Sequence, residues 1–105
     1  SRAKDLYYTA RRVQADEALQ LGLFNHVVAD DELPSATLAL ARQIASGPPI
    51  ALGYMKENIN RAVTSDLRSC LAMEADRLMR CAATEDHKEA VKAFMEKRQP
   101  VFSGR

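Results

Sequence analysis

The sequence contains no tryptophan, and its 105 residues include only three phenylalanines and three tyrosines. Much of the 47% hydrophobic content is alanine, which favours helix but buries little area per residue. We therefore expect a thin core, with part of the apolar surface packing against something outside the chain. Because the chain combines this apolar content with 28% charged residues, it should fold rather than stay disordered.

Catalytic and phosphate-binding motifs are also missing. There are only four glycines and no glycine-rich phosphate loop, and HExxH, CxxC and GxSxG do not occur. The net charge of +1 argues against general nucleic-acid binding, which needs a concentrated basic surface. No apolar run approaches the length of a membrane span, and we find no secretory signal, so no membrane partner is expected.

Cysteine is scarce as well. Cys70 and Cys81 fall on one predicted helix, roughly 16 Å apart along its axis, which is too far for a disulfide. Two thiols are too few for a zinc site, and unpaired thiols are typical of a reducing compartment, so we expect a cytoplasmic protein without a metal site. Residue 1 is Ser rather than Met, which suggests a start that is processed, cloned or cut.

The pattern that remains is helical, and it predicts a mainly α fold. Gly22 is a predicted helix terminator, Thr84 a predicted N-cap and Pro100 a stop. A compact apolar run with adjacent valines predicts one short extended segment near Asn25–Val28. Helices are predicted over residues 1–9, 15–21, from Asp30 or Asp31 to 46, 49–63, 67–83 and 85–98.

Three titratable residues are candidates for acid–base chemistry. His26 has no evident carboxylate or nucleophile beside it, and His87 lies in the acidic first turn of a helix, so structural or solvent-exposed roles are favoured for both. Glu74 lies close to an apolar stripe, where a carboxylate can act as an acid or base with a raised pKa. The favoured alternative is an ion pair with Arg77, Lys56 or a partner chain.

The clearest binding pattern lies near the end of the chain. Phe94, Lys97 and Arg98 are spaced so that one helical face presents an aromatic ring beside two cations. Such a face suits a nucleotide with phosphates, because the ring can contact the base while the cations meet the phosphates. On spacing alone, an ordinary helix C-terminus is favoured, with basic residues at its end and Phe94 in the core.

The same region resembles the end of crotonase-family proteins, the enoyl-CoA hydratases and isomerases. Residues 84–102, TEDHKEAVKAFMEKRQPVF, are similar to the family's D-x-x-E-G, A-F, E-K-R, P and F pattern, and residues 3–9, 12–18, 22–28 and 48–51 follow its earlier motifs in order. Ala10 and Ala90 stand where the family usually has glycine. Both alanines are therefore expected to have a backbone conformation that is ordinary for residues other than glycine. Neither change removes a functional group.

The resemblance implies that residues 1–105 are the C-terminal helical region of a crotonase-like enzyme whose whole fold is α/β. The N-terminal spiral of ββα units, with the oxyanion hole and the catalytic glutamates, is expected to be absent. The intact protein is expected to hydrate 2-enoyl-CoA thioesters, in keeping with fatty acid metabolism. This segment alone is expected to be inactive and to contain no catalytic residue, and no separate cofactor is expected because coenzyme A is part of the substrate.

For the segment itself, the resemblance implies assembly of a homotrimer or hexamer and closure of the acyl-CoA pocket. Phe94 and Lys97 are the residues that it places on coenzyme A; Arg98 is a weaker candidate, and Lys56 is interpreted as structural. Two alternatives remain open. One is another crotonase-type reaction, such as isomerisation, dehalogenation, decarboxylation or hydrolysis. The other is a non-catalytic helical assembly or binding module.

Overall fold

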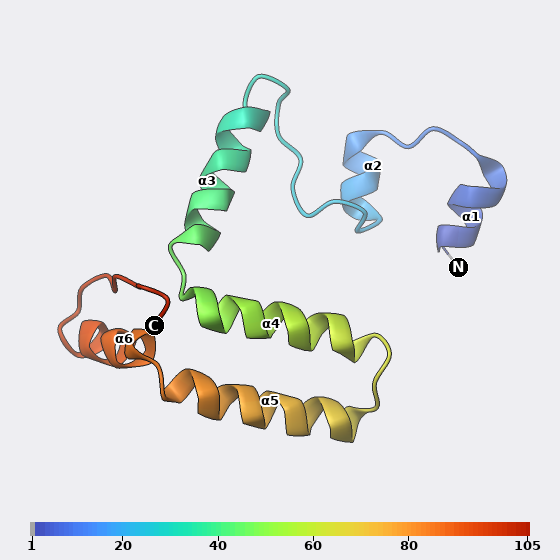
Figure 1. Cartoon of the computed structure of the whole chain (residues 1–105). Helices are drawn as coiled ribbons and strands as arrows, with labels where there is room; N and C mark the ends of the chain where they lie inside the picture. The colour runs from blue at the N-terminus through green and yellow to red at the C-terminus, as the bar shows by residue number, and fades with distance from the viewer. Residues whose placement is uncertain (1) are drawn as a thin grey trace. The chain divides into compact units, whose positions relative to one another are not determined.

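The computed structural model describes residues 2–105, which form six α-helices and no β-strand (Figure 1). The predicted mainly α class is confirmed. Within residues 2–105, no helix combines the length and apolar character that a bilayer crossing requires. The helices are α1 (Arg2–Thr9), α2 (Ala15–Gln20), α3 (Leu33–Ala45), α4 (Pro49–Ala62), α5 (Leu67–Ala82) and α6 (Glu85–Met95).

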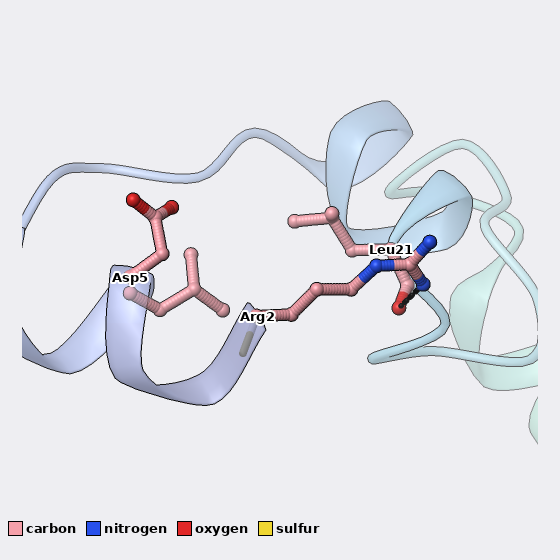
Figure 2. A pocket seen from close by; sticks show the side chains of 4 residues that line it. Arg2, Asp5 and Leu21 are labelled. Carbon is pink, nitrogen blue, oxygen red and sulfur yellow. Dashed lines mark hydrogen bonds between the residues drawn. The ribbon is translucent and has the colours of Figure 1, made fainter.

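The chain divides into two compact units, up to Leu38 and from Ala39 onward. In the first unit, polar contacts join α1 to α2. Arg2 donates from Nη1 to the Leu21 carbonyl at 3.2 Å, and Figure 2 shows its side chain reaching from the start of α1 to the end of α2. Arg11, between the two helices, pairs with Glu17 at 2.7 Å. These contacts, rather than a large apolar core, connect the two short helices.

Both helices of this unit end in left-handed backbone. Gly22 has φ +74°, and the Leu23 N–H bonds back to the Ala18 carbonyl at 2.9 Å, which closes a Schellman turn and confirms Gly22 as the terminator of α2. Ala10 ends α1 with φ +46°. The expectation that Ala10 takes ordinary non-glycine geometry is therefore wrong: the position keeps a glycine-like backbone without a glycine.

The chain between α2 and α3 is irregular, and α3 starts later than predicted. Residues 23–29, including Asn25–Val28, lie in neither a helix nor a β-strand. α3 begins at Leu33 rather than at Asp30 or Asp31, because residues 30–32 form a turn in which the Glu32 carbonyl accepts from the Ser35 hydroxyl at 2.8 Å. Pro34 suits this later start, since a first-turn residue needs no backbone N–H.

In the second unit, α4 and α5 form an antiparallel hairpin (Figure 1). Asp66 caps α5 by accepting from the Ser69 N–H at 3.0 Å, and α5 begins at residue 67 as predicted. Arg77 of α5 contacts two residues of α4. Its Nη2 lies 2.9 Å from Glu57 on α4, and its guanidinium lies over the Tyr54 ring at 4.8 Å.

Among residues 2–105, the buried apolar core is limited to two alanines, Ala18 in the first unit and Ala93 in the second. The predicted thin core is confirmed. Large apolar side chains remain exposed along both helices of the hairpin: Met55, Ile59, Val63, Leu67, Leu71, Leu78 and Met79. Exposed apolar side chains in such number are typical of a surface that packs against another protein surface.

Candidate functional site

Helix α6 starts as predicted. Thr84 is its N-cap, with the side-chain oxygen accepting from the His87 N–H at 3.1 Å. The same hydroxyl donates to the Cys81 carbonyl at 2.7 Å, so one side chain joins the end of α5 to the start of α6. Glu85 and Asp86 occupy the first turn, near the positive end of the helix dipole.

The end of α6 differs from the prediction. The helix stops at Met95 and not at Arg98, because Lys97 adopts a left-handed backbone with φ +54°. The Arg98 N–H bonds to the Ala93 carbonyl at 3.0 Å, and the Lys97 N–H bonds to Phe94 at 3.2 Å, in the pattern of a Schellman turn. Phe94, Lys97 and Arg98 therefore do not share one helical face as predicted.

Two carboxylates of α6, Asp86 and Glu89, bind the tail that follows the helix; we call this pair the carboxylate latch. Glu89 receives Arg98 in a bidentate pair, with Nη1–Oε1 at 2.6 Å and Nη2–Oε2 at 2.9 Å. It also accepts from the Val101 N–H at 3.0 Å. Arg98 uses its third nitrogen, Nε, on Glu96 at 2.6 Å. The residues on either side of Lys97, Glu96 and Arg98, are thus bonded to each other, and Arg98 is also bonded to α6 through Glu89.

Asp86 binds the far end of the tail. Its side chain accepts from the backbone N–H of Ser103 at 2.7 Å and of Gly104 at 3.0 Å, and the Asp86 N–H donates to the Arg105 carbonyl at 3.0 Å. Asp86 is only 3% exposed, and Gly104 packs closely enough on Pro49 that an added Cβ would lie 3.0 Å from the ring. The tail consequently lies folded against α6 and the start of α4 (Figure 1).

The sequence prediction missed this latch. Asp86 and Glu89 are three residues apart on one helix face, and that spacing was the available signal. A carboxylate in the first helical turn, such as Asp86, is already favoured by the helix dipole, and nothing local in the sequence indicates that residues 101–104 return to the helix.

Glu89 and Arg98 shift each other's pKa values. The Arg98 guanidinium, with the Val101 N–H second, lowers the pKa of Glu89 to about 2. Glu89 and then Glu96 raise the pKa of Arg98 in return. Both partners are therefore charged at neutral pH, and the cationic charge of Arg98 is already matched by two carboxylates.

Phe94 and Lys97, the two residues predicted to contact a ligand, are both on the surface. Phe94 is 82% exposed, so it does not lie in the core of this segment. Lys97 is also exposed, and the ion pairs of this region within residues 2–105 use Lys88 and Arg98 but not Lys97. An aromatic ring and an ammonium group are thus free for a ligand, and their contact with coenzyme A stays a prediction.

The other candidate residues do not form a second site. His26 is exposed in an irregular segment, and His87 is exposed on α6. Glu74 is exposed on α5, and its predicted pairing with Arg77 is wrong because Arg77 binds Glu57 and Asp76. In the part of the chain that the structure describes, no group of three or more His, Cys, Asp or Glu side chains is arranged to hold a metal ion.

The chain is similar to a set of acyl-CoA enzymes over almost its whole length. Residues 1–105 match the enoyl-CoA hydratase/isomerase family. The chain is 42% identical to the short-chain-enoyl-CoA hydratase of Clostridium acetobutylicum over 92% of its own length, and 37% identical to the methylmalonyl-CoA decarboxylase of Escherichia coli over 96%. It spans 37% and 40% of those two proteins.

Comparison of the structure with solved structures identifies the same family of enzymes. A crystal structure of enoyl-CoA hydratase from Bacillus anthracis matches all of this chain with a TM-score of 0.95 and 39% identity, while the match covers 41% of that chain. Sequence and structure agree on a family in which the matched region is largely helical. This chain belongs to the enoyl-CoA hydratase/isomerase family.

Proposed function

We propose that this chain is the C-terminal helical region of an enoyl-CoA hydratase, and that the intact protein adds water across the C2–C3 double bond of 2-enoyl-CoA thioesters. The 42% identity to a short-chain-enoyl-CoA hydratase is the observation that supports this reaction most directly. In this proposal, the groups that polarise the thioester carbonyl and handle the water lie upstream; residues 2–105, which the structure describes, bring together no catalytic arrangement of their own.

The proposed role of residues 94–97 is to bind the nucleotide end of coenzyme A in a neighbouring subunit. The phosphates of coenzyme A are anionic, and the exposed Lys97 ammonium is not paired with a carboxylate in the described part of the chain. The exposed Phe94 ring offers a flat apolar surface for adenine. Arg98 is excluded from this role because Glu89 and Glu96 occupy its nitrogens.

The proposed role of the hairpin is subunit assembly as a homotrimer or hexamer. Its exposed apolar side chains include Ile59 at 70% and Leu67 at 74%, on α4 and α5 respectively. Burying them against another surface releases water and is favourable at roughly 25 cal/mol per Å². With this assembly, the segment can both join subunits and close the acyl-CoA pocket.

The intact protein and residues 1–105 alone, each assayed with crotonyl-CoA, test the proposal. The intact protein should hydrate the double bond, and the isolated segment should not. In the intact protein, Lys97→Ala should raise KM roughly tenfold with little change in kcat, since a lost charge-assisted contact to a remote phosphate is worth on the order of 1.4 kcal/mol. Lys88→Ala is the matched control, because it removes an equally charged side chain that is paired with Glu85 on the same helix.

The similarity to methylmalonyl-CoA decarboxylase, and to a 1,2-epoxyphenylacetyl-CoA isomerase at 34% identity, favours a second candidate: another reaction on acyl-CoA. Release of carbon dioxide from methylmalonyl-CoA, or isomerisation of the epoxide, without hydration of crotonyl-CoA would select it. If the intact protein binds coenzyme A esters but converts none of them, the non-catalytic binding module is the correct description.

A further inference from the structure

We propose that Glu89 and Asp86 are positioning residues for the coenzyme A contact: by holding the tail against α6, they fix the backbone of Lys97 beside Phe94. This inference rests on the proposed function, because it assumes that Lys97 meets the ligand. It assigns Arg98 the role of a tether for Lys97 rather than that of a second phosphate ligand.

The first step is the backbone of Lys97. Its φ of +54° lies in the left-handed region, which favours glycine and which a lysine seldom adopts without help. The Lys97 N–H bonds to the Phe94 carbonyl and the Arg98 N–H bonds to the Ala93 carbonyl, so the left-handed residue ends the helix and directs the following chain back toward α6. Something outside the turn must therefore stabilise it.

The second step is that Glu89 binds the chain directly after Lys97. One carboxylate engages the Arg98 guanidinium through two hydrogen bonds and the Val101 N–H through a third. Bidentate pairs of this kind restrict geometry as well as adding attraction. Since the Arg98 N–H is also tied to Ala93, Lys97 lies between a fixed helix end and a fixed residue 98.

The third step is that Asp86 keeps the rest of the tail in place. The buried Asp86 carboxylate holds the amides of Ser103 and Gly104, and its own N–H holds the Arg105 carbonyl. The tail therefore cannot swing away at residue 101 without breaking these bonds. The two carboxylates act at successive points along one segment, and neither needs to touch the ligand.

The fourth step concerns charge. Glu89 and Glu96 both lie within 2.6 Å of Arg98 nitrogens, so the latch offsets the charge of Arg98 and leaves the Lys97 ammonium as the accessible cation of the turn among residues 2–105. An arriving phosphate should therefore bind at Lys97. Replacing Glu89 should loosen Lys97, while Glu96 still offsets the charge of Arg98.

The experiment measures dissociation constants of the intact protein for coenzyme A and for pantetheine, which lacks the nucleotide and its phosphates. Lys97→Ala should weaken coenzyme A binding roughly tenfold. Glu89→Gln should weaken it roughly fivefold and leave pantetheine binding unchanged, whereas the control Glu85→Gln should change neither. In the Lys97→Ala background, Glu89→Gln should have no further effect, because it acts through Lys97.

The outcomes separate the two proposals. If Lys97→Ala leaves coenzyme A binding unchanged, the proposed contact is wrong. If Lys97→Ala weakens binding but Glu89→Gln behaves like Glu85→Gln, or adds its full effect to Lys97→Ala, the contact stands and the positioning role is overturned. Asp86→Asn, with its smaller change in the tail, gives the same comparison if Glu89→Gln does not fold; an equal loss for coenzyme A and pantetheine would also overturn the positioning role.

Discussion

Arg98 and Glu89 meet through two parallel hydrogen bonds, at 2.6 and 2.9 Å, although nine residues separate them in the sequence. The pair closes the turn that ends α6, and a third bond from Arg98 reaches Glu96. A lysine at position 98 could supply the charge but not this planar, forked geometry. The identity of the side chain therefore matters here for shape as much as for charge.

The latch should persist into acid. The pKa of Glu89 is lowered from 4.5 to about 2, first by Arg98, so its contribution to stability is fully present above about pH 4.5 and is lost as the pH falls through about 2. We expect an NMR titration of the Glu89 carboxyl carbon to show a midpoint near 2. Arg98→Ala should return the midpoint toward 4.5; a wild-type midpoint already near 4.5 would contradict the pairing.

Thr84 should stabilise the start of α6 through its two hydrogen bonds. Thr84→Ala removes the acceptor for the His87 N–H and the donor to Cys81, and should lower the free energy of unfolding by about 1 kcal/mol. Urea unfolding measures the change. Thr84→Ser keeps both hydrogen bonds and should retain most of the stability; an equal loss in both variants would show that the methyl group, not the cap, is responsible.

The features that the sequence predicted well depend on neighbouring residues. Thr84 and Gly22 satisfy backbone groups within four residues of themselves, and Pro49 suits the first turn of α4 directly. Their geometry needs no knowledge of the rest of the chain. The helix starts at residues 49, 67 and 85 were therefore predictable from local chemistry alone.

The features that the sequence did not predict depend on distant partners. Pro100 predicts a helix that runs to Arg98, but α6 ends at Met95 because Lys97 is left-handed, and a lysine gives no local sign of such a turn. The bonds from Asp86 to residues 103 and 104 span 17 and 18 positions, and helical spacing carries no information about them. For the candidate site, the types of residue at positions 94 and 97 could be anticipated from the sequence. The hydrogen bonds from Asp86 and Glu89 that hold the tail beside them could not.

Arg77 should couple the two helices of the hairpin. Its guanidinium lies over Tyr54 and pairs with Glu57, so Arg77→Met should destabilise the hairpin by roughly 1 kcal/mol. A double-mutant cycle with Tyr54→Leu, measured by urea unfolding, should give a coupling energy of about 0.5 to 1 kcal/mol. Strict additivity of the two substitutions would mean that the ring and the cation do not interact.

Ala10 should be a site where glycine stabilises. Its φ of +46° is costly for a residue with a Cβ, by roughly 1 kcal/mol or more, and glycine removes that cost in exchange for a smaller loss of unfolded-state entropy. We expect Ala10→Gly to raise the free energy of unfolding by up to about 1 kcal/mol. Ala3→Gly, inside α1, should lower it, and a loss in both variants would contradict a left-handed backbone at residue 10.

The isolated 105-residue chain should self-associate, since the large apolar side chains of α4 and α5 are exposed. Static light scattering should give an average mass above that of the 11.7 kDa monomer and increasing with concentration. Ile59→Lys should reduce the association by placing a charge on the apolar surface. Asn60→Lys, a matched charge change at the next position, should have less effect, and a stable monomer at high concentration would contradict the expectation.

The return of the tail has a consequence for how α6 opens. A helix ordinarily frays at each end separately, because its first and last turns share no bonds. Here the carbonyl of Arg105 is bonded to Asp86 in the first turn, and the segment between them is tied to Glu89. Loss of either end therefore releases bonds at the other, so we expect α6 and residues 96–105 to exchange their amide hydrogens as one cooperative unit rather than as a helix with a loose extension.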